Sequence, residues 1–250
     1  VLTEAIRSGL SLVSGLHRKL TEEYELVKAA DASGQQLIDI RVPPASIPIA
    51  TGRQRSGKRL LMVGTDCCVG KKYSALSLHK ALQERGVAAT FRATGQTGIL
   101  ISGGGIPMDA VVSDFLSGAA ETLTPDAASD HWDVIEGQGS LFHPAYAAVT
   151  LGLLHGSQPD AMVLCHGSGR TVIDEYEDFP VPDLRECVTQ YEQAARVTNR
   201  QSSIVGISLN TQGLSDTEAL SACRDASTLT GLPCVDPMRH ARDSILDALP

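Results

Sequence analysis

The sequence predicts an α/β protein whose main domain is built on a parallel sheet. Short apolar runs alternate with amphipathic stretches along the chain, which is typical of strands joined by crossover helices. The apolar run at residues 60–63 also leads directly into a glycine-containing loop, a lysine pair and an amphipathic stretch. The 250 residues are enough for one large domain or two small ones.

The expected elements follow in order from these patterns. We expect strands at residues 10–13, 37–42, 60–63, 87–91, 134–135, 162–164 and 204–207. A first helix is expected to end within residues 5–9. Further helices are expected at residues 20–30, from the lysine pair to Gly86, and at residues 109–116, 145–154 and 184–195. Ser215 and Glu218 have the spacing of a capping box that opens a further helix. A last helix is expected from Asp236, with Met238, Ala241 and Ile245 facing inward.

A stretch without helical or strand period divides the chain. Residues 43–58 hold three prolines and two glycines and are expected to form a linker. We therefore predict a smaller N-terminal domain with its linker at residues 1–54 and the main α/β domain at 55–250. The chain begins at Val1 with residues that already suggest a helix, so we expect an N-terminal piece to be missing.

Composition excludes several classes of function. The net charge of −8 and an aromatic content of 4% argue against nucleic acid as a partner. No apolar run is long enough to cross a membrane, so we expect no membrane partner. None of the six cysteines has zinc-site spacing, and this usage is typical of a reducing compartment. We expect a cytoplasmic protein with a small-molecule substrate. We expect a homo-oligomer only because symmetric homo-oligomers are common among soluble proteins.

The strand, loop, lysine and helix after residue 60 have the layout of a P-loop, which binds phosphate through backbone N–H groups and a lysine. The predicted cofactor-binding residues are Gly64, Thr65, Asp66, Cys67, Cys68, Val69, Gly70, Lys71 and Lys72. Lys72 stands where Ser or Thr normally binds magnesium, and a lysine cannot ligate a cation unless Ser74 or a water substitutes. The loop therefore favours holding a phosphorylated cofactor, with Lys71 facing solvent and no metal. The alternative is a tight turn with a solvated lysine.

Polar residues follow other strands at the same edge of the sheet. Arg92, Thr94, Gln96 and Thr97 lie in a loop that suggests a ligand pocket, although ordinary loop capping explains the threonines equally well. Arg170 is a candidate to bind a substrate carboxylate.

Three side chains are candidates for a catalytic base. Glu136 ends a strand beside the P-loop, and it could bind a metal, accept a proton or orient a water. His143 precedes a helix N-terminus, which favours a neutral imidazole that can accept a proton. His166 follows another strand and is a second histidine candidate. The sequence around His143 is explained at least as well by a surface turn in which the histidine has no catalytic role.

Several strings together resemble the D-glutamate N-acetyltransferase family, formerly catalogued as a domain of unknown function. They include GTDCCVGKK, ATGQTGI, EGQGSLFHPAY and GISLNT. The resemblance implies a Rossmann-like N-terminal domain, of which residues 1 to about 50 match only the latter part, followed by a P-loop domain. It also implies acetyl-CoA as cofactor, with Lys71 and Lys72 on a cofactor phosphate, and a role in D-amino-acid catabolism. The substrate would be D-glutamate or a similar acidic D-amino acid, for which Arg92 and Arg170 are the carboxylate-binding candidates.

Two other hypotheses stay open at this point. The string GTDCCVGK also resembles dethiobiotin synthetase, which would imply an ATP- and magnesium-dependent ligase or kinase with Asp66 and Glu136 near the metal. The third hypothesis is a nucleotide-sensing module without catalysis.

Overall fold

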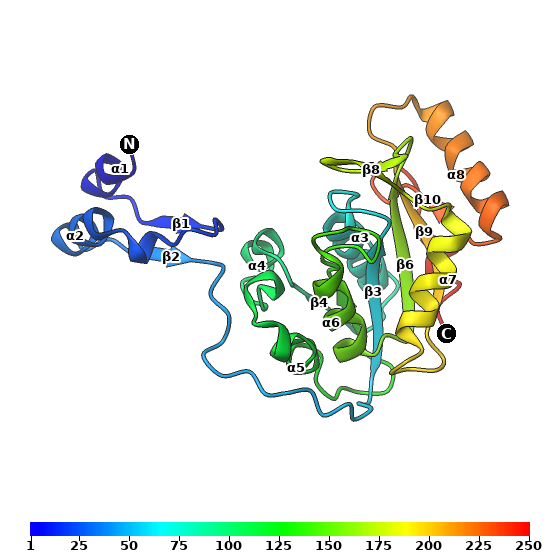
Figure 1. Ribbon diagram of the computed structural model, residues 1–250, viewed down its shortest axis with the longest axis horizontal. Helices are drawn as coiled ribbons and strands as arrows, with labels where there is room; N and C mark the ends of the chain where they lie inside the picture. The colour runs from blue at the N-terminus through cyan, green and yellow to red at the C-terminus, as the bar shows by residue number, and fades with distance from the viewer.

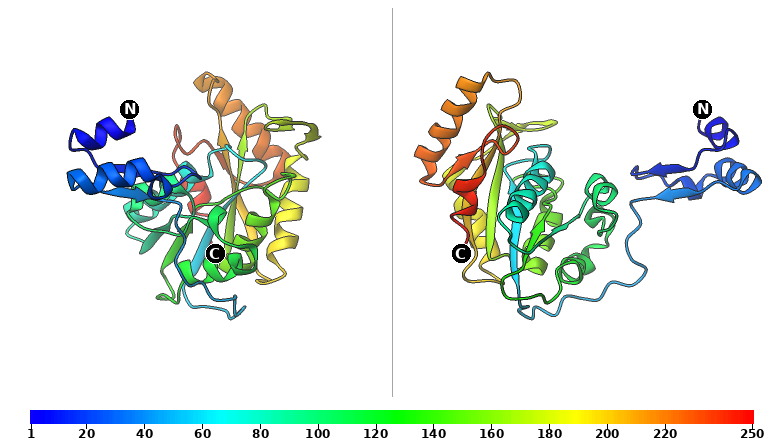
Figure 2. Two further views of the ribbon diagram at one scale, coloured as in Figure 1. Left: turned by 60° about the vertical axis from the view of Figure 1, so that its left-hand side comes forward. Right: turned by 180° about the vertical axis from the view of Figure 1, so that it is seen from behind.

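The computed structural model describes residues 1–250 and shows two units joined by an extended segment (Figure 1). The N-terminal unit contains α1 (Leu2–Arg7), β1 (Leu12–Ser14), a 3₁₀ turn (Leu20–Glu22), α2 (Tyr24–Ser33) and β2 (Leu37–Asp39). Its two strands are parallel, and a small core around Ile6 and Leu26 lies beneath them. This unit stands out from the main body, as the view from behind also shows (Figure 2).

The main domain has a six-stranded parallel sheet, which confirms the predicted α/β fold. The strand order is β10-β9-β6-β3-β5-β4. The strands are β3 (Lys58–Gly64), β4 (Ala89–Arg92), β5 (Trp132–Ile135), β6 (Ala161–Gly167), β9 (Ser203–Asn210) and β10 (Cys234–Val235). Because all six run in one direction, the loops after their carboxyl ends meet at one edge of the sheet.

Helices cover both faces of this sheet. Leu60 and Met62 of β3 face α3 (Lys71–Glu84) and the short α9 (Asp243–Leu246). Leu61 and Val63 face the opposite side, which is covered by α5 (Leu116–Leu123), α6 (Ala147–Ser157), α7 (Leu184–Ala195) and α8 (Asp216–Thr230). Burial on both faces explains why residues 60–63 of β3 are continuously apolar rather than alternating.

Three local expectations were wrong. Gln96 and Thr97, expected in a loop, begin the helix α4 (Gln96–Ser102). Residues 109–116 form two 3₁₀ turns, and the α-helix begins only at Leu116. The last helix begins at Asp243, so Met238 is 67% exposed and Ala241 is also exposed instead of facing inward, although Ile245 is buried as expected.

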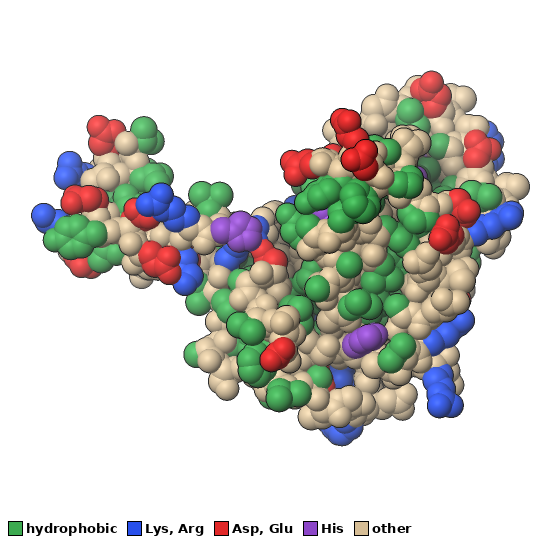
Figure 3. All heavy atoms as spheres, viewed as in Figure 1, with side chains coloured by type: hydrophobic (Ala, Val, Ile, Leu, Met, Phe, Trp, Pro, Cys, Tyr) green, Lys and Arg blue, Asp and Glu red, His purple; other side chains and the backbone are tan.

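A hairpin that the sequence patterns missed rises from the carboxyl edge of the sheet. It consists of β7 (Val172–Ile173) and β8 (Tyr176–Pro180), which pair antiparallel. In Figure 3, acidic side chains gather on the part of the surface where Figure 1 shows β8. The capping box of Ser215 and Glu218 is confirmed at the start of α8. No helix has the length and apolar content needed to cross a membrane.

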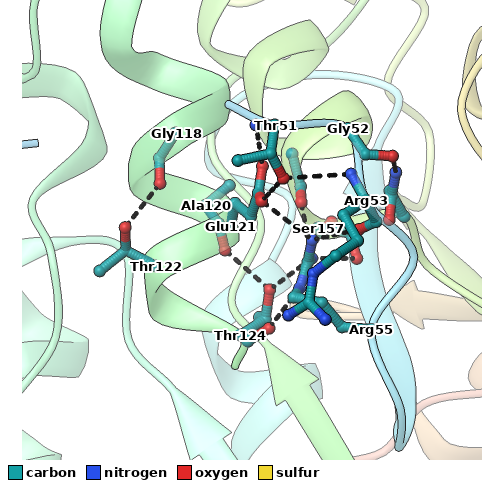
Figure 4. Close-up of polar contacts among 12 residues, drawn as sticks. Thr51, Gly52, Arg53, Arg55, Gly118, Ala120, Glu121, Thr122, Thr124 and Ser157 are labelled. Atoms are coloured by element: carbon teal, nitrogen blue, oxygen red, sulfur yellow. Dashed lines mark hydrogen bonds and ion pairs between the residues drawn. The ribbon is translucent and has the colours of Figure 1, made fainter. Parts of the chain in front are cut away.

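The linker is fastened to the main domain by a buried arginine. Arg55 has a side chain only 4% exposed, and it donates from Nε to the carbonyl of Thr124 at 2.7 Å. Its Nη2 donates to the carbonyl of Gly156 at 2.8 Å. Thr124 is the C-cap of α5, and Gly156 lies in the last turn of α6, where carbonyls lack intrahelical partners. Figure 4 shows Arg55 and Thr124 among the polar contacts of this region. Arg55 therefore caps two helices at once.

The N-terminal unit touches the main domain near α4. Arg41 forms an ion pair with Asp109 and also donates from Nε to the carbonyl of Gly15 at 2.5 Å. A Cβ placed on Gly15 would lie 2.8 Å from Cγ of Gln96, so this turn packs closely on the first residue of α4. Through these contacts the N-terminal unit packs on the segment that follows β4.

Replacement of Arg55 by methionine should destabilise the protein strongly. Arg55→Met leaves buried carbonyls without this donor, and each such group costs about 1–3 kcal/mol. We expect the free energy of unfolding, measured by urea denaturation, to fall by roughly 2–5 kcal/mol. The matched control is Arg53→Met, because Arg53 is 67% exposed and pairs with Asp126 on the surface. That variant should lose no more than about 1 kcal/mol. Equal losses in the two variants would contradict the capping role of Arg55.

Candidate functional site

A cleft of about 670 Å³ runs along the carboxyl edge of the sheet. Its centre is the P-loop with the first turn of α3. One wall is the segment 136–139 that follows β5. The other wall is formed by Ser208 and Asn210 of β9, Gln212, and the residues 236–239 that follow β10. The topology therefore brings together loops that lie far apart in the sequence.

The P-loop presents a row of free backbone donors to this cleft. Gly70 has a φ of 98° and Cys68 a φ of 56°, which turns the chain sharply before α3. The N–H groups from Cys68 to Lys72 have no hydrogen-bond acceptor inside the protein. At the N-terminus of a 14-residue helix such groups form an anion site, and the helix dipole adds to it.

Lys71 is buried rather than facing solvent as expected. It is 8% exposed, and its Nζ donates to the carbonyl of Asp66 at 2.8 Å. Burial lowers the pKa of this ammonium, which is the opposite of what a bound phosphate would do. Lys71 nevertheless lines the cleft, so an anion there could contact it. The neighbouring Lys72 is half-buried, with Nζ 4.5 Å from the centre of the Tyr73 ring.

The hydroxyl of Ser74 is already hydrogen-bonded within the protein. It donates to the carbonyl of Gly70 at 3.1 Å and shares a hydrogen bond of 2.7 Å with the hydroxyl of Ser208. Ser74 is 2% exposed, so both contacts are shielded from water. The P-loop thus offers a phosphate group cations and N–H donors, and offers a metal ion few oxygen ligands.

Glu136 is held at the N-terminus of α4. Its Oε2 accepts hydrogen bonds of 3.0 Å from the N–H groups of both Thr94 and Gly95. A Cβ on Gly98 would lie 2.2 Å from this oxygen, so only glycine fits there. Burial raises the pKa of Glu136, although the two N–H donors and the lysine pair oppose the shift. The other oxygen, Oε1, accepts no hydrogen bond within the protein, and Glu136 lines the cleft.

Asp66 ties the P-loop to the hairpin. Its Oδ2 accepts from Nη1 of Arg170 at 2.8 Å and from the N–H of Asp174 at 2.9 Å. Its Oδ1 accepts from the N–H of Cys67 at 2.6 Å, and the side chain is fully buried. Nη1 of Arg170 also lies 3.3 Å from Oδ1 of Asp174. A substrate carboxylate at Arg170 would therefore have to compete with two carboxylates of the protein.

The two histidines lie close to the P-loop. Nδ1 of His143 accepts from the N–H of Ala145 at 3.1 Å, so the proton of the neutral ring belongs on Nε2. The ring stacks on Tyr146 and meets the edge of Tyr176 from the hairpin. His166 shares a hydrogen bond of 2.9 Å with Thr65 through Nδ1. Burial, together with the charge of Arg170, lowers the pKa of His166 and favours its neutral form.

The predicted site residues divide into two groups. Residues 67–72 and Glu136 line the cleft. The remaining candidates do not line it: Gly64, Thr65, Asp66, Arg92, Thr94, Gln96, Thr97, His143, His166 and Arg170. Nε of Arg92 donates to the buried Asp133 at 2.7 Å. Thr94 is buried and hydrogen-bonds to the Glu136 carbonyl, Gln96 packs on the N-terminal unit, and Thr97 is exposed.

Two features of the site escaped the sequence patterns. Tyr191 is fully buried, and its hydroxyl donates to the carbonyl of Gly64 at 2.6 Å while accepting from the N–H of Leu141 at 3.1 Å. The sequence indicated only that Tyr191 lies on the apolar face of a helix. Arg239 lines the far wall of the cleft and pairs with Asp216. Its place after β10 was hidden because that two-residue strand gave no pattern.

Comparison with known proteins places this geometry in a family. The DUF1611_C P-loop domain, described as a domain of unknown function, matches residues 48–246, and the DUF1611_N Rossmann-like domain matches residues 1–43. A D-glutamate N-acetyltransferase of Tritonibacter scottomollicae is 51% identical over 249 residues, which are 100% of this chain and 75% of that protein. A D-glutamate N-acetyltransferase of a Pseudoalteromonas species is 50% identical over 246 residues, with 98% and 74% covered.

A solved structure agrees in fold. The crystal structure of a DUF1611 family protein from Anabaena variabilis superposes with a TM-score of 0.93 at 39% identity, and the match covers 99% of this chain and 73% of that one. The family matches reach across both units and include the P-loop and the wall formed after β5. The chain therefore belongs to the DUF1611 family, with its Rossmann-like N-terminal part and its P-loop domain.

Proposed function

We propose that this protein is an acyltransferase that moves the acetyl group of acetyl-CoA to the amine of D-glutamate. The observation that carries the proposal is the 51% and 50% identity to two proteins named D-glutamate N-acetyltransferase, over essentially the whole chain. The cleft supports the choice of donor. The free N–H groups from Cys68 to Lys72 suit the diphosphate of coenzyme A, and two lysines add positive charge.

The two walls of the cleft suggest how the donor lies. The start of the P-loop bonds to β6, where the N–H of Thr65 donates to the carbonyl of Cys165. Further along, Sγ of Cys67 lies within 4.8 Å of a ring nitrogen of His143, which follows β5, and a Cβ on Gly70 would lie 4.0 Å from Cβ of Asn210 in β9. With the diphosphate on the N–H groups, the adenosine part would extend toward Asn210 and Arg239. The thioester would then extend toward the wall that follows β5, which carries Glu136.

Glu136 is the favoured base for the acceptor amine. An ammonium group must lose a proton before it can attack a thioester, and Oε1 of Glu136 is free to accept one. The raised pKa makes this carboxylate a better proton acceptor than an exposed glutamate. His143 is less suited as a base, because its Nδ1 lone pair is occupied by the Ala145 N–H. Its Nε2–H is better suited to donate a hydrogen bond.

The geometry does not favour the ATP- and magnesium-dependent alternative. In that hypothesis Asp66 and Glu136 lie near the metal. Here Asp66 is committed to Arg170 and to two backbone N–H groups, and Oε2 of Glu136 is committed to two more. Lys72 occupies the usual position of the hydroxyl ligand, and Ser74 is hydrogen-bonded elsewhere.

Release of coenzyme A tests the proposed reaction directly. We expect thiol release from acetyl-CoA to be fast with D-glutamate and slow with L-glutamate or with no acceptor. The product should have the mass of N-acetyl-D-glutamate. Equal rates under all three conditions would refute the proposal, and magnesium-dependent binding of ATP without binding of acetyl-CoA would favour the ligase.

Replacement of Lys71 should weaken donor binding. Lys71→Met keeps most of the buried stem but removes a charge-assisted contact worth about 1.5–3 kcal/mol, which is roughly a tenfold to hundredfold loss of affinity. Titration calorimetry with acetyl-CoA measures the change. Lys80→Met is the matched control, because Lys80 lies on the same helix and is 73% exposed. Unchanged affinity in Lys71→Met would mean that this lysine does not contact the donor.

Glu136→Gln should lower the activity of the protein without lowering its stability. Because the base acts deprotonated, kcat/KM of the native protein should fall as the pH drops through the raised pKa of Glu136. The variant should lose about a hundredfold or more in kcat/KM and lose this acid limb. A carboxyl pKa raised by folding lowers the stability of the fold as the pH rises from the pKa of the unfolded chain through the raised pKa, so the variant should be at least as stable as the native protein at neutral pH. An acid limb that persists in Glu136→Gln, as in the surface control Glu84→Gln, would exclude Glu136 as the base.

A further inference from the structure

The wall of the cleft that follows β9 and β10 carries a single cationic side chain. Of the basic residues that line the cleft, Lys71 and Lys72 belong to the P-loop, and Arg239 alone lies on this wall. Its side chain is 29% exposed, so a ligand in the cleft can reach the guanidinium. Neither the binding of a diphosphate at the P-loop nor the proposed transfer to the amine requires a cation at this place.

The guanidinium of Arg239 is held by the turn that follows β9. Its Nη2 donates to the carbonyl of Leu214 at 2.9 Å and to that of Thr211 at 3.4 Å. Its Nε lies 3.8 Å from Oδ2 of Asp236, which is too far for a hydrogen bond. The N–H on Nε therefore has no acceptor within the protein. A guanidinium that is fixed on one side and keeps a free N–H is well suited to bind a phosphate.

One carboxylate, that of Asp216, competes for this guanidinium. Nη1 of Arg239 donates to Oδ1 of Asp216 at 2.9 Å, but the Asp216 side chain is 92% exposed. An exposed ion pair contributes little, so a phosphate with two negative charges can displace Asp216. Arg170 differs in this respect, because its partner Asp66 is fully buried and is also fixed by two backbone N–H groups.

The charges of the two walls determine which wall a phosphate prefers. The wall after β5 carries Glu136, whose Oε1 accepts no hydrogen bond and would repel a phosphate. The opposite wall also holds a carboxylate, Asp236, but that group is buried. Its oxygens accept from the N–H of Met238 and from both the N–H and the hydroxyl of Thr211. The wall of Arg239 therefore favours the phosphate-bearing end of a donor.

Arg239 lies close enough to the P-loop for one ligand to reach both. A Cβ on Gly70 would lie 4.0 Å from Cβ of Asn210, the last residue of β9. The next residue, Thr211, accepts a hydrogen bond from Arg239. The chain thus leads from the anion-binding turn to the guanidinium through two consecutive residues. In coenzyme A only one ribose separates the diphosphate from the 3′-phosphate.

We propose that Arg239 binds the 3′-phosphate of coenzyme A and thereby selects acetyl-CoA over donors that lack this phosphate. The inference rests on the proposed function, which supplies the donor. With the diphosphate on the N–H groups of the P-loop, the 3′-phosphate reaches the wall of Arg239. The long arm that ends in the thioester leaves the diphosphate on its other side, so the site of Arg239 places no demand on where the acetyl group lies.

A comparison of coenzyme A with 3′-dephospho-coenzyme A tests the inference by binding alone. In titration calorimetry, the native protein should bind coenzyme A about tenfold to hundredfold more tightly, because the other ligand lacks a charge-assisted contact. In Arg239→Met, the affinity for coenzyme A should fall to that for 3′-dephospho-coenzyme A, which should itself change by no more than about twofold. Arg224→Met is the matched control and should keep the full discrimination, because Arg224 is exposed on α8 and does not line the cleft.

Removal of the competing carboxylate should have the opposite effect. Asp216→Asn frees Nη1 of Arg239, so coenzyme A should bind more tightly by up to about fivefold, the limit set by an exposed ion pair. The affinity for 3′-dephospho-coenzyme A should stay the same. A purely structural role of Arg239 would not make the loss of its partner strengthen the binding of one ligand alone.

The outcomes separate this inference from the proposed function. Equal affinities of the native protein for the two ligands, or discrimination that persists in Arg239→Met, would overturn the role of Arg239 and leave transfer from acetyl-CoA to D-glutamate intact. A gain for both ligands alike in Asp216→Asn would also overturn it. Discrimination between the ligands without acetylation of any form of glutamate would support Arg239 and refute D-glutamate as acceptor. Binding of neither ligand would refute the proposed donor together with the inference.

Discussion

The P-loop can receive an anion because the polar groups around it have already found partners inside the protein. The N–H of Thr65 bonds to the carbonyl of Cys165, that of Cys67 bonds to Asp66, and Tyr191 bridges the backbone of Gly64. These contacts hold the start of the loop against β6 and α7. What is left is a run of N–H groups from Cys68 onward, which needs an external acceptor. The anion site thus consists of the N–H groups that the hydrogen bonds within the protein leave without an acceptor.

A second helix N-terminus serves the protein internally. The first turn of α4 binds the carboxylate of Glu136 much as the first turn of α3 would bind a phosphate. This contact orients one oxygen and leaves the other free in a buried setting. A carboxylate so placed keeps its position while its affinity for a proton rises.

The same helix is where the N-terminal unit meets the main domain. Gly15 packs on Gln96, and Arg41 pairs with Asp109 just beyond the loop that follows α4. The helix that positions Glu136 is therefore shared between the cleft and the interface of the two units. Arg55 fixes the other end of the connection by capping α5 and α6, so both ends of the linker segment are anchored.

Local sequence determined much of this protein, because local patterns reflect local physics. Continuous apolar runs predicted the buried strands, glycine and lysine after β3 predicted the P-loop, and Ser215 with Glu218 predicted the capping box. The same patterns placed Glu136 at the sheet edge. They could not show that Lys71 is buried, that Arg92 and Arg170 already have carboxylate partners, or that Nδ1 of His143 is occupied. Only the tertiary structure decided these points. The burial of Lys71 and the partners of Arg92 and Arg170 depend on segments that lie far apart in the chain and meet only in the folded sheet. The contact between His143 and Ala145 is local, but it depends on the conformation of the loop, which residue types alone do not fix.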